Sequence, residues 1–132
     1  MSAGNECKFC TAAHNAIATI LLNDDTVTRK VQADIDTAPI SEKMKTLLKI
    51  AKATGVNGKQ VTREMIANAK AAGATDAELH DTVLIAALFS LYNRYVDGLA
   101  SVTPEDPAFY NRLGMILKEK GYVPSENRYA NL

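Results

Sequence analysis

The amino-acid sequence predicts an all-α fold, a single compact helical domain of about six helices. Apolar residues recur at helical spacing along most of the 132 residues, and no useful length alternates apolar with polar residues. Seven Gly and four Pro supply too few turns for an all-β fold. Because 47% of residues are hydrophobic and 23% charged, as in ordinary globular proteins, we expect one domain over residues 1–132.

The first two helices are expected between residues 6 and 31. Glu6 to about Leu22 forms the first of them, since four apolar residues fall on one side: Ala13, Ile17, Ile20 and Leu21. The polar stretch Asn23-Asp24-Asp25 ends this helix and can cap a short second helix through Val31.

Two further helices are expected after Pro39. Ser41 is a typical N-cap, and the apolar stripe that follows it recurs at i, i+3, i+4 and i+7: Met44, Leu47, Leu48 and Ala51. Gly55 is expected to end this helix. Thr62 then caps a fourth helix over residues 63–72.

The two helices of the C-terminal half begin with recognisable caps. Thr75 and Glu78 form a predicted capping box before the longest apolar segment, Leu79 to about Leu99. A helix that is apolar on all sides is buried on all sides, so we expect another subunit to cover part of it. The last helix starts near Pro107 and ends at Gly121, with an inward face of Phe109, Leu113, Ile116 and Leu117. Residues 124–132 are expected to form a loose tail.

Charge and terminal sequence exclude several classes of partner. Fifteen basic and fifteen acidic residues give a net charge of zero, whereas nucleic-acid and membrane-surface binders usually carry a basic excess. The sequence has neither an apolar run of about 20 residues nor a secretory signal, so a cytoplasmic location is expected. Zero net charge leaves self-association unopposed, and we expect a homo-oligomer.

One patch indicates chemistry: Cys7, Cys10 and His14, in the pattern C-x-x-C-x-x-x-H. At about 100° per residue, a helix would place all three side chains on one face. Cys10 and His14 are i, i+4 neighbours, and Cys7 and Cys10 could form a disulfide without moving other elements. A helix N-terminus favours the reactive thiolate, and a nearby His can accept the thiol proton. Attack on a peroxide would give a sulfenic acid, which a second thiol converts to a disulfide.

Other interpretations of the cysteines are weaker. A structural zinc site would need a fourth ligand, and the only other histidine, His80, lies in a different predicted helix. Attachment of c-type haem needs His directly after the second Cys, where this chain has Thr11. A thioredoxin motif follows a strand, and none is predicted. Two buried cysteines beside a core histidine form the plainest alternative. No metal and no cofactor are expected.

The same residues resemble a known family. The segment from Cys7 to His14 resembles the C-x-x-C-x-x-x-H motif of AhpD-like alkylhydroperoxidases, within the carboxymuconolactone decarboxylase superfamily. Residues 61–64 and 72–79 are similar to the segment before that family's long helix, and Phe89 to Arg94 resembles the F-x-x-x-N-R signature of its peroxidase-related branch. The resemblance covers residues 2–122.

The resemblance implies a trimer or hexamer with Cys10 as the peroxidatic cysteine, Cys7 as the resolving cysteine and His14 in the proton relay. The substrate would be a small hydroperoxide, and a dithiol or a thiol protein would be the reductant. The family's relay also uses a Glu on an upstream helix, and only six residues precede Cys7. A carboxylate from elsewhere would have to replace it, with Glu64, Glu78 and Asp81 as candidates.

The sequence leads to three hypotheses about function. The leading hypothesis is an antioxidant thiol-dependent hydroperoxide reductase, an oxidoreductase that uses a redox-active disulfide. A non-enzymatic redox-sensing or assembly protein is the alternative from another class, because the relay Glu is absent. A lactone decarboxylase of the same superfamily ranks third, since those relatives generally lack the cysteine pair.

Overall fold

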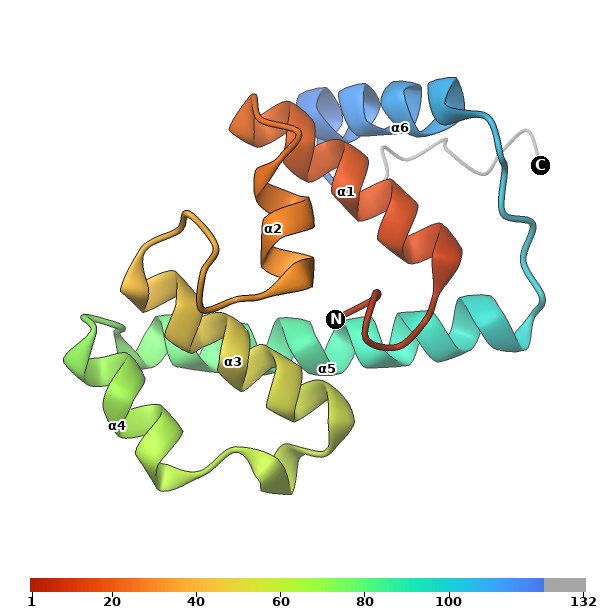
Figure 1. The fold of residues 1–132 in the computed structure, drawn as a ribbon. Coiled ribbons are helices and arrows are strands. Elements are labelled where there is room, and N and C mark those ends of the chain that lie inside the picture. Colours follow the sequence, from red (N-terminus) through yellow and green to blue (C-terminus); the bar gives the residue numbers. More distant parts are fainter. Residues whose placement is uncertain (123–132) are drawn as a thin grey trace.

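The structure, a computed structural model, describes residues 1–122 and is all-helical, with no strand in that range (Figure 1). The tail predicted over residues 124–132 lies outside the described residues. The elements are α1 (Lys8–Leu22), α2 (Val27–Ala33), α3 (Glu42–Val56), the 3₁₀ helix η1 (Gly58–Gln60), α4 (Arg63–Ala71), α5 (Asp76–Gly98) and α6 (Pro107–Lys120). The predicted fold class and number of α-helices are therefore confirmed for this part of the chain.

The helices associate in two groups. In Figure 1, α6 lies along α1, while α3 crosses the long helix α5 and packs against α4. The N-terminal segment before α1 lies between the two groups (Figure 1). Residues 1–7 therefore connect the two groups of helices. The contacts of this segment help to fix the position of α1 relative to α5.

The main hydrophobic core lies between α3, α4 and α5. Its centre is Ile50, which is completely buried. The other buried members are Leu47, Ala69, Ala74 and Leu79. Leu47 comes from the predicted apolar stripe of α3, whereas Met44 of the same stripe is exposed.

The pairing of α1 with α6 depends on a glycine. A Cβ atom at Gly114 would lie 2.7 Å from Cδ1 of Ile20 and 3.3 Å from the backbone nitrogen of Ile17. Gly114 and Tyr110 are the buried residues of α6, whereas Ile116 of the predicted inward face is partly exposed. The missing side chain at Gly114 therefore leaves room for the Ile20 side chain and for the close approach of the α1 backbone.

The start of α1 differs from the prediction. Glu6 adopts a left-handed conformation with φ of 59° and lies outside the helix, and Cys7 is the N-cap. The helix ends as expected at Asn23, which is left-handed with φ of 50° and donates its N–H to the Thr19 carbonyl. The second helix begins after Thr26, whose N–H and hydroxyl both bond to the Asp24 carboxylate.

Gly55 does not end α3. The helix continues to Val56, and Gly55 is buried within it. A Cβ atom at this position would lie 1.8 Å from Cε of Met1. Gly55 therefore leaves room for the Met1 side chain. No local sequence signal predicts this contact.

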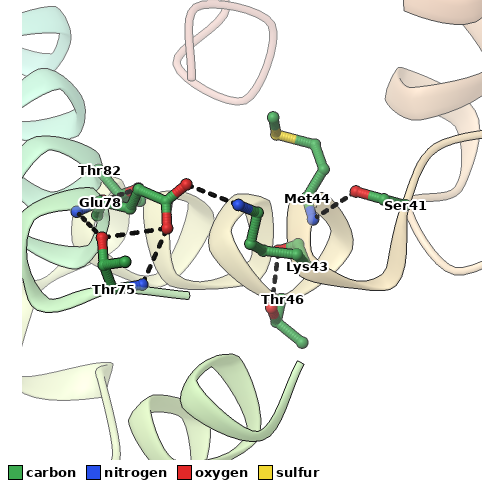
Figure 2. A network of polar contacts seen from close by, with 7 residues as sticks. All are labelled: Ser41, Lys43, Met44, Thr46, Thr75, Glu78 and Thr82. Carbon is green, nitrogen blue, oxygen red and sulfur yellow. Dashed lines mark hydrogen bonds and ion pairs between the residues drawn. The ribbon is translucent and has the colours of Figure 1, made fainter. Parts of the chain in front are cut away.

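The predicted N-caps are confirmed. The hydroxyls of Ser41 and Thr62 accept hydrogen bonds from the backbone three residues later, at 3.2 Å each. Thr75 and Glu78 form the reciprocal capping box, with bonds of 3.1 and 2.8 Å. Glu78 also accepts a 2.7 Å hydrogen bond from Lys43 of α3, which ties the start of α5 to its neighbour (Figure 2).

This network makes stability depend on pH. The hydrogen bond from Lys43, followed by those from Thr75, lowers the pKa of Glu78 from 4.5 to about 2. A lowered pKa stabilises the folded state above pH 4.5, and that stabilisation is lost as pH falls toward about 2. We expect Glu78→Gln to unfold at lower temperature than the wild type at pH 7 and to match it below pH 2. Thermal denaturation across this pH range checks this prediction, with the exposed Glu105→Gln variant as control. A difference in unfolding temperature between Glu78→Gln and wild type that stays the same at every pH would contradict it.

The apolar residues of α5 are not covered within one subunit. Only Leu79, Ala86 and Asn93 of this helix are buried. Seven large apolar or aromatic residues are substantially exposed: Val83, Leu84, Ile85, Leu88, Leu91, Tyr92 and Tyr95. Within residues 1–122, α3, the N-terminal segment and His14 contact part of α5 and leave these residues open, while the expected cover by another subunit is a matter outside the single chain.

The total surface agrees with this open face. A compact monomer of 14.3 kDa exposes about 6,800 Å², and this chain exposes 9121 Å². Despite this apolar surface, no helix within residues 1–122 is long and apolar enough to cross a membrane.

Candidate functional site

Cys7 and Cys10 lie at the N-terminus of α1. Cys7 is the N-cap, with extended backbone (φ −74°, ψ 100°), and Cys10 is in the first helical turn. Both thiols are free and buried, with exposed fractions of 0% and 5%. The Cys7 carbonyl accepts the N–H of Thr11 at 2.9 Å, and its own N–H donates to the Ser2 carbonyl at 3.1 Å. The pair is therefore fixed by the helix on one side and by the N-terminal segment on the other.

The surroundings of Cys7 keep it protonated. Burial, reinforced by the Cys10 side chain, raises the pKa of Cys7 from 9.0 to about 12. The Cys10 amide opposes this rise, although it does not form a true capping hydrogen bond with the Cys7 sulfur. Contact with Asp97 raises the pKa further. Burial therefore disfavours the thiolate of Cys7.

Asp97, near the end of α5, is one of the groups that raise the pKa of Cys7, and sequence reasoning did not single it out. The candidate carboxylates named from sequence are elsewhere in the subunit: Glu78 belongs to the capping box at the other end of α5, and Asp81 lies beside the exposed His80 at 3.4 Å. The available signal was helical spacing, because Asp97 lies one turn after Asn93 on the same helix face.

His14 contacts Cys10 through the backbone. Its Nδ1 lies 2.8 Å from the Cys10 carbonyl oxygen. A carbonyl only accepts hydrogen bonds, so Nδ1 carries a proton, and in the neutral ring Nε2 is the acceptor. Phe89 packs against the ring edge-to-face at 4.6 Å, and Tyr122 stacks on it at 5.9 Å. The ring of His14 thus contacts the backbone of Cys10 and not its thiol, and its orientation is set by a carbonyl and two aromatic side chains.

Asn93 connects the N-terminal segment to α5. It is 1% exposed, donates a 3.0 Å hydrogen bond from Nδ2 to the Ser2 hydroxyl and accepts a 2.8 Å bond from Asn5. The neighbouring Arg94 is exposed and donates to the Ser90 carbonyl at 2.9 Å. Asn93 instead holds in place the segment that leads directly into Cys7.

Two further observations concern the surroundings of the cysteine pair. The Thr11 hydroxyl, one turn after Cys7, is buried and has no hydrogen-bond partner among the described residues. Within residues 1–122 no group of three or more His, Cys, Asp or Glu side chains is arranged to hold a metal ion.

Comparisons of the chain with protein-family models, with curated proteins and with solved structures gave no match.

Proposed function

We propose that the protein is a thiol-dependent hydroperoxide reductase in which Cys10 attacks and Cys7 resolves. The observation that carries this proposal is the pair itself: two free, buried thiols one helical turn apart at the N-terminus of α1, where a negative charge is favoured. Burial raises the pKa of Cys7, which favours Cys10 as the attacking thiol. The resemblance to AhpD-like alkylhydroperoxidases supports the same assignment, and His14 lies beside Cys10, bonded to its carbonyl.

The reaction proceeds in three steps. The Cys10 thiolate attacks one oxygen of the hydroperoxide, so an S–O bond forms, the O–O bond breaks, and the alkoxide leaves as an alcohol after protonation. Cys7 then attacks the Cys10 sulfur, a disulfide forms and water leaves. An external dithiol reduces the disulfide by thiol exchange and supplies the two electrons that the peroxide consumed.

The test is consumption of an organic hydroperoxide with a dithiol as reductant. We expect the wild-type protein to consume many equivalents, while the double variant Cys7→Ser/Cys10→Ser matches the protein-free reaction. A single equivalent consumed, followed by no further turnover, would overturn the enzyme proposal. That result would favour a redox sensor on the same fold.

We also propose that the protein is a homo-oligomer assembled through the exposed face of α5. Leu84, Leu88 and Leu91 are 48%, 41% and 57% exposed and follow one another at helical spacing on a single stripe. A shallow apolar groove between α4 and α5, lined in part by Ile66 and Val83, continues this surface. A second copy fits best, because the net charge of zero gives no repulsion between copies.

Replacing Leu91 with Glu tests the assembly. On a monomer, a surface substitution of this kind changes stability by no more than about 0.5 kcal/mol, whereas at an apolar interface it buries a charge without a partner. We expect the wild type to sediment as an oligomer and Leu91→Glu to dissociate toward the monomer mass. Val102→Glu, at an 83% exposed loop position, is the control. A monomeric wild type, or a variant of unchanged mass, would contradict the assembly.

A further inference from the structure

The N-terminal segment is anchored to the helices at two points. Asn93 of α5 donates to the Ser2 hydroxyl at 3.0 Å and accepts from the Asn5 amide at 2.8 Å. The Met1 side chain fills the space beside Gly55 of α3, where a Cβ atom would lie 1.8 Å from the Met1 Cε. Both anchors are contacts with other helices, and the segment contains no helix of its own.

A strained residue lies between these anchors and the cysteine pair. Glu6 has φ of 59°, in the left-handed region that costs conformational energy for most residues other than Gly and Asn. The Glu6 N–H donates to the Ala3 carbonyl at 3.2 Å, and the Cys7 N–H donates to the Ser2 carbonyl at 3.1 Å. The anchored segment therefore folds back onto Cys7 against a local strain at Glu6, and release of the anchors would relax that strain.

Burial of the two sulfurs makes this segment important for reduction of the disulfide. Cys7 is 0% exposed and Cys10 is 5% exposed. A thiolate reduces a disulfide by direct attack on one of its sulfurs, so the rate depends on access to that sulfur. Sulfurs as buried as these become accessible only through a local opening, and such openings occur most readily outside the packed helices. The N-terminal segment meets this condition and is bonded directly to the Cys7 backbone.

We propose that the N-terminal segment is a gate for the reducing dithiol, an inference that rests on the proposed function because that reaction forms the disulfide. The segment leaves its two anchors and moves away from Cys7 by rotation at Glu6. One thiolate of the dithiol then attacks a sulfur of the Cys7–Cys10 disulfide and forms a mixed disulfide. The second thiol of the reagent displaces the protein sulfur, so the reagent becomes a disulfide and two protein thiols form.

The rate of disulfide reduction in anchor variants tests the gate. Diamide forms the disulfide without any peroxide, because it accepts the two thiol hydrogens itself. Dithiothreitol is then added, and acid quenching followed by intact mass measurement gives the rate of reduction. Asn93→Ala removes both side-chain bonds of the first anchor, and Gly55→Ala displaces the Met1 side chain. Gly58→Ala is the matched control, since an added Cβ atom there meets nothing within 4 Å.

We expect the disulfide of Asn93→Ala to be reduced about tenfold faster than that of the wild type, in line with the loss of buried hydrogen bonds. Gly55→Ala should also be reduced severalfold faster, and Gly58→Ala should match the wild type. Glu6→Asn should have the opposite effect, because Asn tolerates the left-handed conformation and favours the closed segment. Its disulfide should be reduced about threefold more slowly than that of Glu6→Gln, which removes the same charge but keeps the strain.

Hydrogen exchange measured by NMR identifies the opening itself. The amides of Asn5, Glu6 and Cys7 are bonded within the segment, and in Asn93→Ala their exchange should accelerate by the same factor as the reduction. Faster exchange of these amides with an unchanged rate of reduction would overturn the inference, because opening of the segment would then not control access to the disulfide. Equal rates of reduction in Glu6→Asn and Glu6→Gln would contradict the rotation at Glu6.

The same variants separate this inference from the proposed function. If reduction of the diamide-formed disulfide depends on the two anchors but the protein does not consume hydroperoxide, the peroxidase proposal fails and the gate stands. If hydroperoxide is consumed and the anchor variants are reduced at the wild-type rate, the gate fails and the peroxidase proposal stands. Failure of diamide to form the disulfide would overturn both.

Discussion

Replacing Cys10 with Ser should lower hydroperoxide turnover by about 10³-fold or more, because this removes the attacking sulfur itself. Replacing Cys7 with Ser should leave the first attack intact and stop the reaction at the Cys10 sulfenic acid. The two single variants therefore differ in what they accumulate. Hydroperoxide consumption combined with a sulfenic-acid trapping reagent such as dimedone distinguishes them by mass.

The asymmetry follows from the environments of the two sulfurs. Burial and the Cys10 side chain raise the pKa of Cys7, which disfavours Cys7 as the attacking thiolate at neutral pH. A trapped sulfenic acid on Cys7 in the Cys10→Ser protein would reverse the assigned roles. Turnover that persists in either single variant would contradict the two-cysteine mechanism.

The second large effect is expected from Asn93→Ala. This change leaves the Ser2 hydroxyl and the Asn5 amide without their bonds to α5, and a buried group left unsatisfied costs about 1–3 kcal/mol. We therefore expect a loss of about 2 kcal/mol in the free energy of unfolding. The N-terminal segment should also loosen, so that a thiol reagent reaches Cys7 faster than in the wild type.

Chemical denaturation and timed alkylation with peptide mapping measure these two consequences. Arg94→Ala is the matched control, because Arg94 is exposed and bonds to the Ser90 carbonyl of its own helix. A double-mutant cycle of Asn93→Ala with Asn5→Ala should show coupling, since the two side chains contact each other. Unchanged alkylation of Cys7 in Asn93→Ala would show that the segment does not protect the site.

The helices could be predicted from sequence because their signals are local. Ser41, Thr62 and Thr75 each form the cap that the sequence indicates, and a cap depends only on residues within one turn. The same reasoning failed for Glu6 and Gly55. Glu6 turns into a left-handed conformation and Gly55 stays within its helix, and in both places the N-terminal segment packs back on the molecule.

The residues of the candidate site also differ in whether local sequence signals could predict their contacts. Cys7, Cys10 and His14 are within seven positions of one another, so helical spacing was enough to bring them together. Asn93 lies about 90 positions away from the segment that it contacts, at Ser2 and Asn5. A contact over that separation depends on how α5 packs against residues 1–7, which the spacing of residues along one helix does not determine.

The central claim is that Cys7 and Cys10 form a working redox pair. Intact mass measured after a stoichiometric amount of organic hydroperoxide, and again after a dithiol, tests it most directly. The account predicts a rapid loss of two hydrogen atoms, reversed by the dithiol and repeatable over many cycles, with no loss in Cys7→Ser or Cys10→Ser. A wild-type protein that keeps both hydrogens, or loses them only slowly and without catalytic excess, would contradict it.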